Sequence, residues 1–204
     1  MNHPLKHLFV AAGMLAVFAV PTFAAKAKIG EKAPEFTLTD INGVTHSLPD
    51  FAGKTVVLEW VNPECPFVVK HYRSGNIPNL QSAAAAEETV WLSINSGSPG
   101  AQGDFDPAKV RAWMDKTGAA PAAYMRDQEG TVGRLYGART TPHMFVINPD
   151  GNLVYNGAID SIPSANARDL DRAQNYVEAA LVSIKAGGTP AKSTSRPYGC
   201  SVKY

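Results

Sequence analysis

The chain has 204 residues, of which 45% are hydrophobic, and its 19 basic residues nearly balance 18 acidic residues. A near-neutral chain has no electrostatic attraction to nucleic acid or to an anionic membrane surface, so we predict neither partner. Two cysteines, Cys65 and Cys200, are too few for a scaffold that depends on disulfides for its core.

The first 24 residues are typical of a secretory signal peptide. Lys6 lies in a short basic start, residues 8–20 are mainly apolar, and small residues surround Ala24. The apolar run is shorter than the ~20 residues that a membrane span needs. We therefore predict cleavage near Ala24 and export to the periplasm, with an uncleaved membrane anchor as the alternative. A single domain at residues 25–186 and a tail at residues 187–204 would follow.

The first half of the mature chain predicts a hairpin and two buried strands. Residues 36–38 and 44–47 form the candidate hairpin, and residues 55–61 and 89–94 are rich in β-branched and apolar side chains. Between these two strands, residues 65–86 are long enough for a crossover helix, which favours parallel pairing.

The second half predicts a helix, another hairpin and a closing helix. The first helix begins at Pro107 and ends at Gly118. Residues 143–147 and 153–156 flank a turn, and residues 166–185 have an amphipathic helical pattern. This order predicts an α/β fold with a mixed central sheet and helices on both faces, an N-terminal hairpin extension and an extended C-terminal tail.

Cys65 is the strongest candidate for a reactive residue. It follows a predicted buried strand, and Pro66 begins the next helix. A thiol at a helix N-terminus faces free N–H groups and the positive end of the helix dipole, which lower its pKa. The preceding Asn62-Pro63-Glu64 predicts a surface turn, so we expect an accessible thiol. An inert buried cysteine is the alternative.

Three segments carry a resemblance to known proteins. They are residues 59–67 (Glu-Trp-Val-Asn-Pro-Glu-Cys-Pro-Phe), residues 139–146 (Arg-Thr-Thr-Pro-His-Met-Phe-Val) and residues 198–204 (Tyr-Gly-Cys-Ser-Val-Lys-Tyr). Together they resemble exported peroxiredoxin-like (AhpC/TSA, redoxin-domain) proteins. The resemblance covers residues 30–185 and implies a thioredoxin-like fold and a thiol-dependent oxidoreductase.

This chain departs from the patterns of the related families at three positions. Thioredoxins have a second cysteine three residues after the first, and Val68 occupies that position here. Peroxiredoxins have a proline and a threonine before the peroxidatic cysteine, and Leu58 and Asn62 stand at those positions. A neighbouring cysteine therefore cannot resolve an intermediate formed on Cys65.

The resemblance also implies roles for residues around Cys65. Glu59 matches the buried acid that moves protons in thioredoxins, although an edge-strand residue facing water is the alternative reading. Arg139 can place a positive charge near the sulfur and favour the thiolate. We therefore name Cys65, Cys200, Glu59 and Arg139 as candidate catalytic residues.

The predicted substrate-binding residues surround the same thiol. Pro142 matches the cis-proline of the fold, which with Thr141 exposes backbone to an extended substrate. The Asn62 amide can donate a hydrogen bond to a peroxide oxygen, and Pro66 begins the helix beside the thiol. Of the histidines, His71 is expected on the surface, on the side of the helix away from Cys65.

Cys200 can reach Cys65 through the tail. The segment from Gly187 spans up to ~45 Å when extended, and the radius of gyration of such a domain is ~16 Å. We predict that Cys65 attacks a protein disulfide or a peroxide and that Cys200 resolves the intermediate. An external thiol reductant would then regenerate both thiols, with no cofactor and no metal.

Three other uses of the cysteines stay open. A permanent Cys65–Cys200 disulfide would stabilise the fold by about 5 kcal/mol in the chain-entropy model, and the protein would then be a non-catalytic binding or adaptor protein. Cys200 can instead link two chains. A Cu(I)-binding module would use Cys65, Cys200 and a histidine such as His143.

Overall fold

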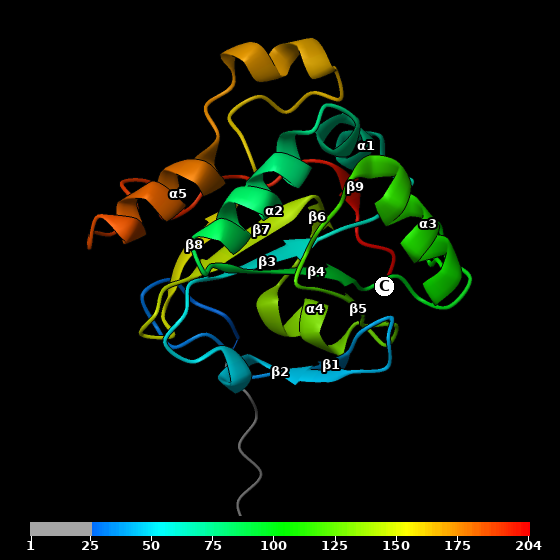
Figure 1. Cartoon of the computed structure of the whole chain (residues 1–204), viewed down its shortest axis with the longest axis horizontal. Helices are drawn as coiled ribbons and strands as arrows, with labels where there is room; N and C mark the ends of the chain where they lie inside the picture. Colours follow the sequence, from blue (N-terminus) through cyan, green and yellow to red (C-terminus); the bar gives the residue numbers. More distant parts are fainter. Residues whose placement is uncertain (1–25) are drawn as a thin grey trace, which may run out of the picture.

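The computed structural model describes residues 26–204, so the predicted signal peptide at residues 1–24 lies outside the described residues. A five-stranded sheet with the strand order β5-β4-β3-β7-β8 forms the centre of the molecule (Figure 1). Its strands are β3 (Val56–Trp60), β4 (Val90–Asn95), β5 (Ala123–Arg126), β7 (His143–Ile147) and β8 (Leu153–Gly157). The pairs β3–β4 and β4–β5 are parallel, whereas β3–β7 and β7–β8 are antiparallel. The predicted mixed sheet is confirmed.

Helices cover both faces of this sheet, as predicted. They are α1 (Pro66–Arg73), α2 (Asn76–Ala86), α3 (Pro107–Thr117), α4 (Thr131–Tyr136) and α5 (Tyr176–Lys185). Figure 1 shows α1, α2, α3 and α5 on one face, with α4 on the other. Strand β3 is buried along its whole length, and its alternate residues enter two cores. Val57 packs under α1 and α2, and Leu58 packs on the face of α4.

The N-terminal hairpin and the tail both pair as short strands. Strands β1 (Thr37–Thr39) and β2 (Thr45–Ser47) form the predicted antiparallel hairpin. The tail returns along the domain after α5 (red in Figure 1). There β9 (Cys200–Ser201) pairs antiparallel with β6 (Thr140–Thr141).

Two of the predicted helices differ from the structure, and two short elements were missed. The crossover is two helices because Gly75 adopts a φ of +78°, which ends the helical path between α1 and α2. The closing helix begins at Tyr176, where Asn175 caps it, and the 3₁₀ turn η2 (Ala167–Arg172) occupies its predicted start. Sequence analysis also missed β5 and α4, two elements of four and six residues.

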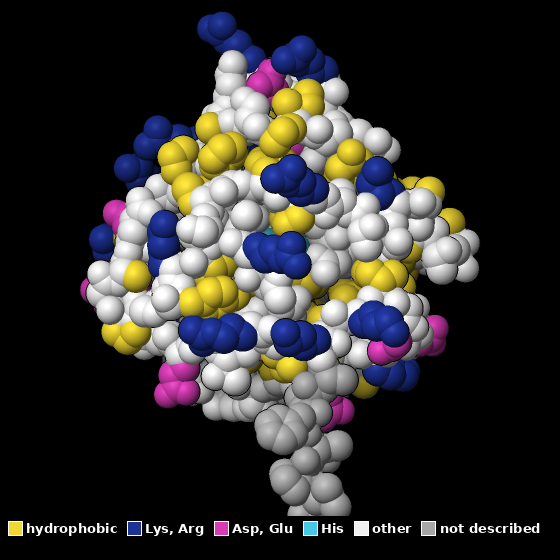
Figure 2. Space-filling model, turned by 180° about the vertical axis from the view of Figure 1, so that it is seen from behind, with side chains coloured by type: hydrophobic (Ala, Val, Ile, Leu, Met, Phe, Trp, Pro, Cys, Tyr) yellow, Lys and Arg dark blue, Asp and Glu magenta, His cyan; other side chains and the backbone are white. Residues whose placement is uncertain are grey.

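A short 3₁₀ turn, η1 (Leu48–Phe51), completes the elements. Within residues 26–204, no helix has the length and apolar character needed to cross a membrane. On the face seen from behind, lysine and arginine side chains are spread widely and acidic ones are few (Figure 2).

Candidate active site

Cys65 is the residue that caps the N-terminus of α1, immediately before Pro66. Its N–H donates to the Asn62 carbonyl at 3.0 Å, and its carbonyl accepts from Val69 at 2.8 Å. The predicted strand-to-helix position is therefore confirmed. The expected exposure is wrong, because Cys65 has 0% exposed surface and belongs to the core under α1 and α2.

The Cys65 thiol lies against the predicted proline turn. Its Sγ donates to the Thr141 carbonyl oxygen at 3.0 Å, and the Thr141–Pro142 peptide bond is cis as predicted. Thr141 and Pro142 are both buried. Burial of Cys65 thus comes from contact with this turn and with the tail above it.

The tail brings Cys200 to the same place. In the β6–β9 pairing, Cys200 is the direct partner of Thr141, the residue whose carbonyl accepts from Cys65. The backbone approach is so close that a Cβ on Gly199 would lie 2.0 Å from the Thr141 oxygen. Gly199 also has a φ of +129°, so only glycine fits there. Both thiols are free, and Cys200 is partly exposed whereas Cys65 is sealed.

The two thiols have different acidities. Burial by itself would raise the pKa of Cys65, but the Cys200 side chain and the Val68 N–H outweigh it and hold that pKa below its ordinary value. Burial and the neighbouring Cys65 raise the pKa of Cys200 to about 11. Cys65 is therefore the better thiolate and the better leaving group of the pair.

Glu59 lies in the central strand, so the edge-strand alternative is wrong. Its carboxylate is fully buried and accepts hydrogen bonds from four side chains, which together with it we call the Glu59 cluster. The donors are Tyr72 at 2.9 Å, Trp91 at 2.8 Å, Ser93 at 3.0 Å and Gln81 at 3.5 Å. Burial raises the pKa of Glu59, while these donors act in the opposite direction. None of its hydrogen bonds in the described structure reaches a cysteine.

The other predicted site residues make contacts that do not include the Cys65 thiol. Arg139 is exposed, and its backbone N–H donates to His143 at 3.2 Å. The Asn62 side chain is buried, and it joins the turn before Cys65 to the loop that contains Gln102. Its amide donates to the Gln102 carbonyl at 3.1 Å, and its oxygen accepts from the Glu64 N–H at 2.9 Å. The placement of Asn62 therefore favours a role in shaping the turn before Cys65.

A family comparison gives the wider context of this site. A model described as the AhpC/TSA family matches residues 29–156, which is more than half of the chain. The chain belongs to the AhpC/TSA family. No curated protein matches the sequence. The family match includes Cys65, Glu59 and Pro142 but ends before the tail, so Cys200 lies outside it.

Solved structures show a likeness over a larger share of the chain. A hypothetical protein from Sinorhizobium meliloti is 23% identical with a TM-score of 0.73, and the match covers 89% of this chain and 97% of that one. An uncharacterized conserved protein from Geobacillus kaustophilus is 25% identical with a TM-score of 0.71, covering 89% and 94%. A putative thiol:disulfide interchange protein DsbE from Chlorobium tepidum is 21% identical with a TM-score of 0.53, covering 64% and 85%. The thioredoxin-like fold of this AhpC/TSA protein is confirmed.

The cavity beside Thr141 is small. The Thr141 hydroxyl is buried and has no partner at hydrogen-bonding geometry within the described residues. Thr141, Asn62 and Asn95 line a cavity of about 10 Å³. That volume is close to the minimum for a single water molecule. This cavity is therefore too small to hold an organic substrate.

His71 and His143 are both buried and make contacts other than to a cysteine. No group of three or more His, Cys, Asp or Glu side chains suited to a metal occurs in residues 26–204. His143 packs against Phe145 and contacts Asn156 at 2.8 Å, and burial lowers its pKa to about 4. His71, which was expected on the surface, is fully buried.

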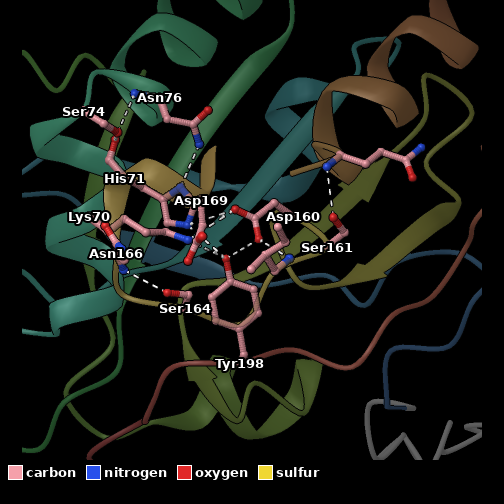
Figure 3. A network of polar contacts seen from close by, with 12 residues as sticks. Lys70, His71, Ser74, Asn76, Asp160, Ser161, Ser164, Asn166, Asp169 and Tyr198 are labelled. Carbon is pink, nitrogen blue, oxygen red and sulfur yellow. Dashed lines mark hydrogen bonds and ion pairs between the residues drawn. The ribbon is translucent and has the colours of Figure 1, made fainter. Parts of the chain in front are cut away.

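Sequence reasoning missed three residues that meet where the tail packs on α1. Lys70, Asp160 and Tyr198 form a buried polar network with His71 (Figure 3). The only sequence signal was the position of Tyr198 in the C-terminal motif, two residues before Cys200. Lys70 and Asp160 have no local pattern that marks them.

Proposed function

We propose that this protein is an exported thiol–disulfide oxidoreductase whose redox couple is Cys65 and Cys200. One observation carries the proposal: both cysteines meet at Thr141, one through its thiol and the other through strand pairing. Membership of the AhpC/TSA family supports an oxidoreductase-type activity. The leader-like residues 1–24 support export to the periplasm.

The exposure of the two sulfurs favours an order of events. In the oxidised protein, a partner thiolate attacks the partly exposed Cys200 sulfur, and the Cys65–Cys200 bond breaks. Cys65 leaves as a thiolate, which its lowered pKa favours. A second partner thiol then attacks the mixed disulfide and releases Cys200. The partner loses two electrons to this protein, and the reverse sequence reduces a partner disulfide.

This order differs from the sequence-based prediction in which Cys65 attacks first. That prediction assumed an accessible Cys65, and the thiol has 0% exposed surface. Partners would be protein dithiols or disulfides together with an external thiol reductant. Thr141 and Pro142 are the proposed backbone contacts for the partner, once it is joined to Cys200.

A redox titration with single-cysteine variants tests the proposal. The purified chain is equilibrated with mixtures of reduced and oxidised glutathione, and peptide mapping follows the Cys65–Cys200 disulfide. We expect reversible formation, and we expect Cys65→Ser to retain a glutathione adduct on Cys200 that forms faster than the Cys65 adduct in Cys200→Ser. The double serine variant is the control.

Two results would overturn the proposal. A disulfide that stays oxidised below about −300 mV would be a structural bridge, as in the adaptor alternative. Absence of the disulfide at every ratio would remove the couple altogether.

Peroxide reduction is a second candidate because of the family match. In that reaction, the Cys65 thiolate attacks a peroxide oxygen, the O–O bond breaks, and a sulfenic acid and water or an alcohol form. Cys200 then attacks the sulfenic sulfur and releases water. Rapid peroxide consumption by the reduced chain, with sulfenic acid on Cys65 in Cys200→Ser, would favour this candidate over disulfide exchange.

A further inference from the structure

A buried network of four side chains joins the tail to α1. We call Lys70, His71, Asp160 and Tyr198 the tail latch (Figure 3). The Tyr198 hydroxyl donates to Asp160 at 2.5 Å and accepts from Lys70 at 3.3 Å and from His71 at 3.1 Å. Lys70 also pairs directly with Asp160 at 3.4 Å. One tail hydroxyl thus satisfies three groups of the domain.

The burial of these charges suggests a role other than stability. The side chains of Lys70 and Asp160 are 0% and 1% exposed. Removing two charges from water is costly, and apolar residues of similar volume often stabilise a core as well or better. Buried ion pairs are best attested as devices that fix one arrangement among several. The arrangement fixed here is the position of the tail on α1.

Tyr198 contacts α1 in two further ways. Its ring packs edge-on against Phe67, with centroids 5.7 Å apart, and the Lys70 ammonium lies 5.3 Å from the ring centroid. Both residues belong to the helix that Cys65 caps. The latch therefore anchors the tail to the same rigid element that carries the first thiol.

The two chain segments that lead from the tail latch to Cys65 and to Cys200 have similar lengths. From Lys70 back to Cys65, five helical residues rise ~7.5 Å. From Tyr198 forward to Cys200, two extended residues span ~7 Å. Gly199 lies between them and permits the close approach to Thr141. Anchoring at Tyr198 therefore keeps the path from the latch to Cys200 about as short as the path from the latch to Cys65.

We propose that the tail latch holds Cys200 against Cys65 and that Tyr198 is a positioning residue for their disulfide exchange. The inference rests on the proposed redox couple. In the latched reduced protein, Cys200 is held beside Thr141, the residue whose carbonyl accepts from the Cys65 thiol. Loss of the Tyr198 hydroxyl would free the tail in the reduced state, whereas the disulfide would still hold it in the oxidised state. The equilibrium would then shift towards the dithiol.

Tyr198→Phe is the test because it removes only the hydroxyl. Ring packing on Phe67 and the Lys70–Asp160 pair remain, so the variant is expected to fold. Tyr136→Phe is the matched control, since its hydroxyl donates to the Pro34 carbonyl at 2.6 Å on the opposite face of the sheet. Each variant is equilibrated with glutathione as the full chain, and the Cys65–Cys200 equilibrium constant is measured.

We expect the constant to fall about tenfold or more in Tyr198→Phe, as for loss of a hydrogen bond to a charged group. We expect no change in Tyr136→Phe. In a Cys200→Ser background, Tyr198→Phe should also make Cys65 react faster with iodoacetamide, because the tail covers that thiol less of the time. If the Tyr198 hydroxyl had only a structural role, both variants would unfold at a lower midpoint and the Cys65–Cys200 equilibrium constant would stay unchanged.

An unchanged equilibrium constant in Tyr198→Phe, with wild-type protein forming the disulfide reversibly, would overturn the positioning role. Equal shifts in Tyr198→Phe and Tyr136→Phe would overturn it as well. Failure of the wild-type chain to form the disulfide would instead remove the proposed couple, so the two failures are distinguishable.

Discussion

Consecutive residues of α1 serve two buried polar clusters that differ in what they join. Tyr72 points to Glu59 in the central sheet, whereas Lys70 and His71 point to Asp160 and the tail. The Glu59 cluster draws all its members from strands and helices of one packed domain. The tail latch joins that domain to a segment near the end of the chain. Buried hydrogen bonds thus fix helix packing in the Glu59 cluster. In our proposal, those of the tail latch fix the position of Cys200 relative to Cys65.

The largest expected effect comes from opening the tail latch. In Asp160→Ala, the Lys70 charge stays buried without its partner, so the free energy of unfolding should fall by about 3–5 kcal/mol. Urea unfolding of the reduced proteins at neutral pH measures this. The double variant Lys70→Met with Asp160→Leu removes both charges and should recover most of the loss. A near-wild-type Asp160→Ala would contradict the burial of this pair.

Glu59→Gln probes the other cluster with a smaller expected effect. Its amide would direct N–H groups at the Trp91 and Ser93 donors, so stability should fall by about 1–3 kcal/mol. We expect the Cys65–Cys200 equilibrium with glutathione to stay at its wild-type value. Stopped-flow exchange on the same variant tests the predicted proton transfer. Slow exchange at an unchanged equilibrium would support that role for Glu59 and remove the contrast between the clusters.

The free energy of unfolding should change with pH in opposite directions for the two clusters. Burial and the Lys70 charge lower the pKa of His71 from 6.5 to about 3, so the neutral imidazole contributes fully to the stability of the fold above pH 6.5. This contribution is lost as the pH falls from 6.5 towards 3, by on the order of 1–2 kcal/mol between pH 7 and pH 5. Glu59 has a raised pKa, so its contribution is present below the ordinary carboxyl pKa of 4.5 and is lost as the pH rises.

His71→Gln isolates the first of these effects. Its unfolding free energy, measured by urea titration from pH 5 to pH 8, should be less sensitive to acid than that of wild type. Asp160, Lys70 and Tyr198 face the His71 ring and remain in this variant. Parallel curves for the two proteins would show that His71 is not held neutral by its surroundings.

Local sequence patterns predicted the elements that depend on local physics. The buried strand β3 and the helix start at Pro66 follow from a β-branched run and a proline, whereas the Thr141–Pro142 turn was implied by the family resemblance. Predictions failed where a single backbone angle or a long-range contact determined the local structure. Gly75 ends α1, and β5 has too few residues for a clear period.

By itself, the sequence determined a thioredoxin-like α/β fold with a thiol at a helix N-terminus beside a cis-proline turn. Only the tertiary structure decided that this thiol is sealed, that Cys200 shares its Thr141 partner, and that Tyr198 anchors the tail. The Cys65–Thr141 contact joins residues that are 76 positions apart in the sequence, and the His71–Tyr198 contact joins residues that are 127 positions apart. Periodicity and capping signals extend over a few residues, so they report local conformation. The path of the tail across the domain is set by packing between distant segments.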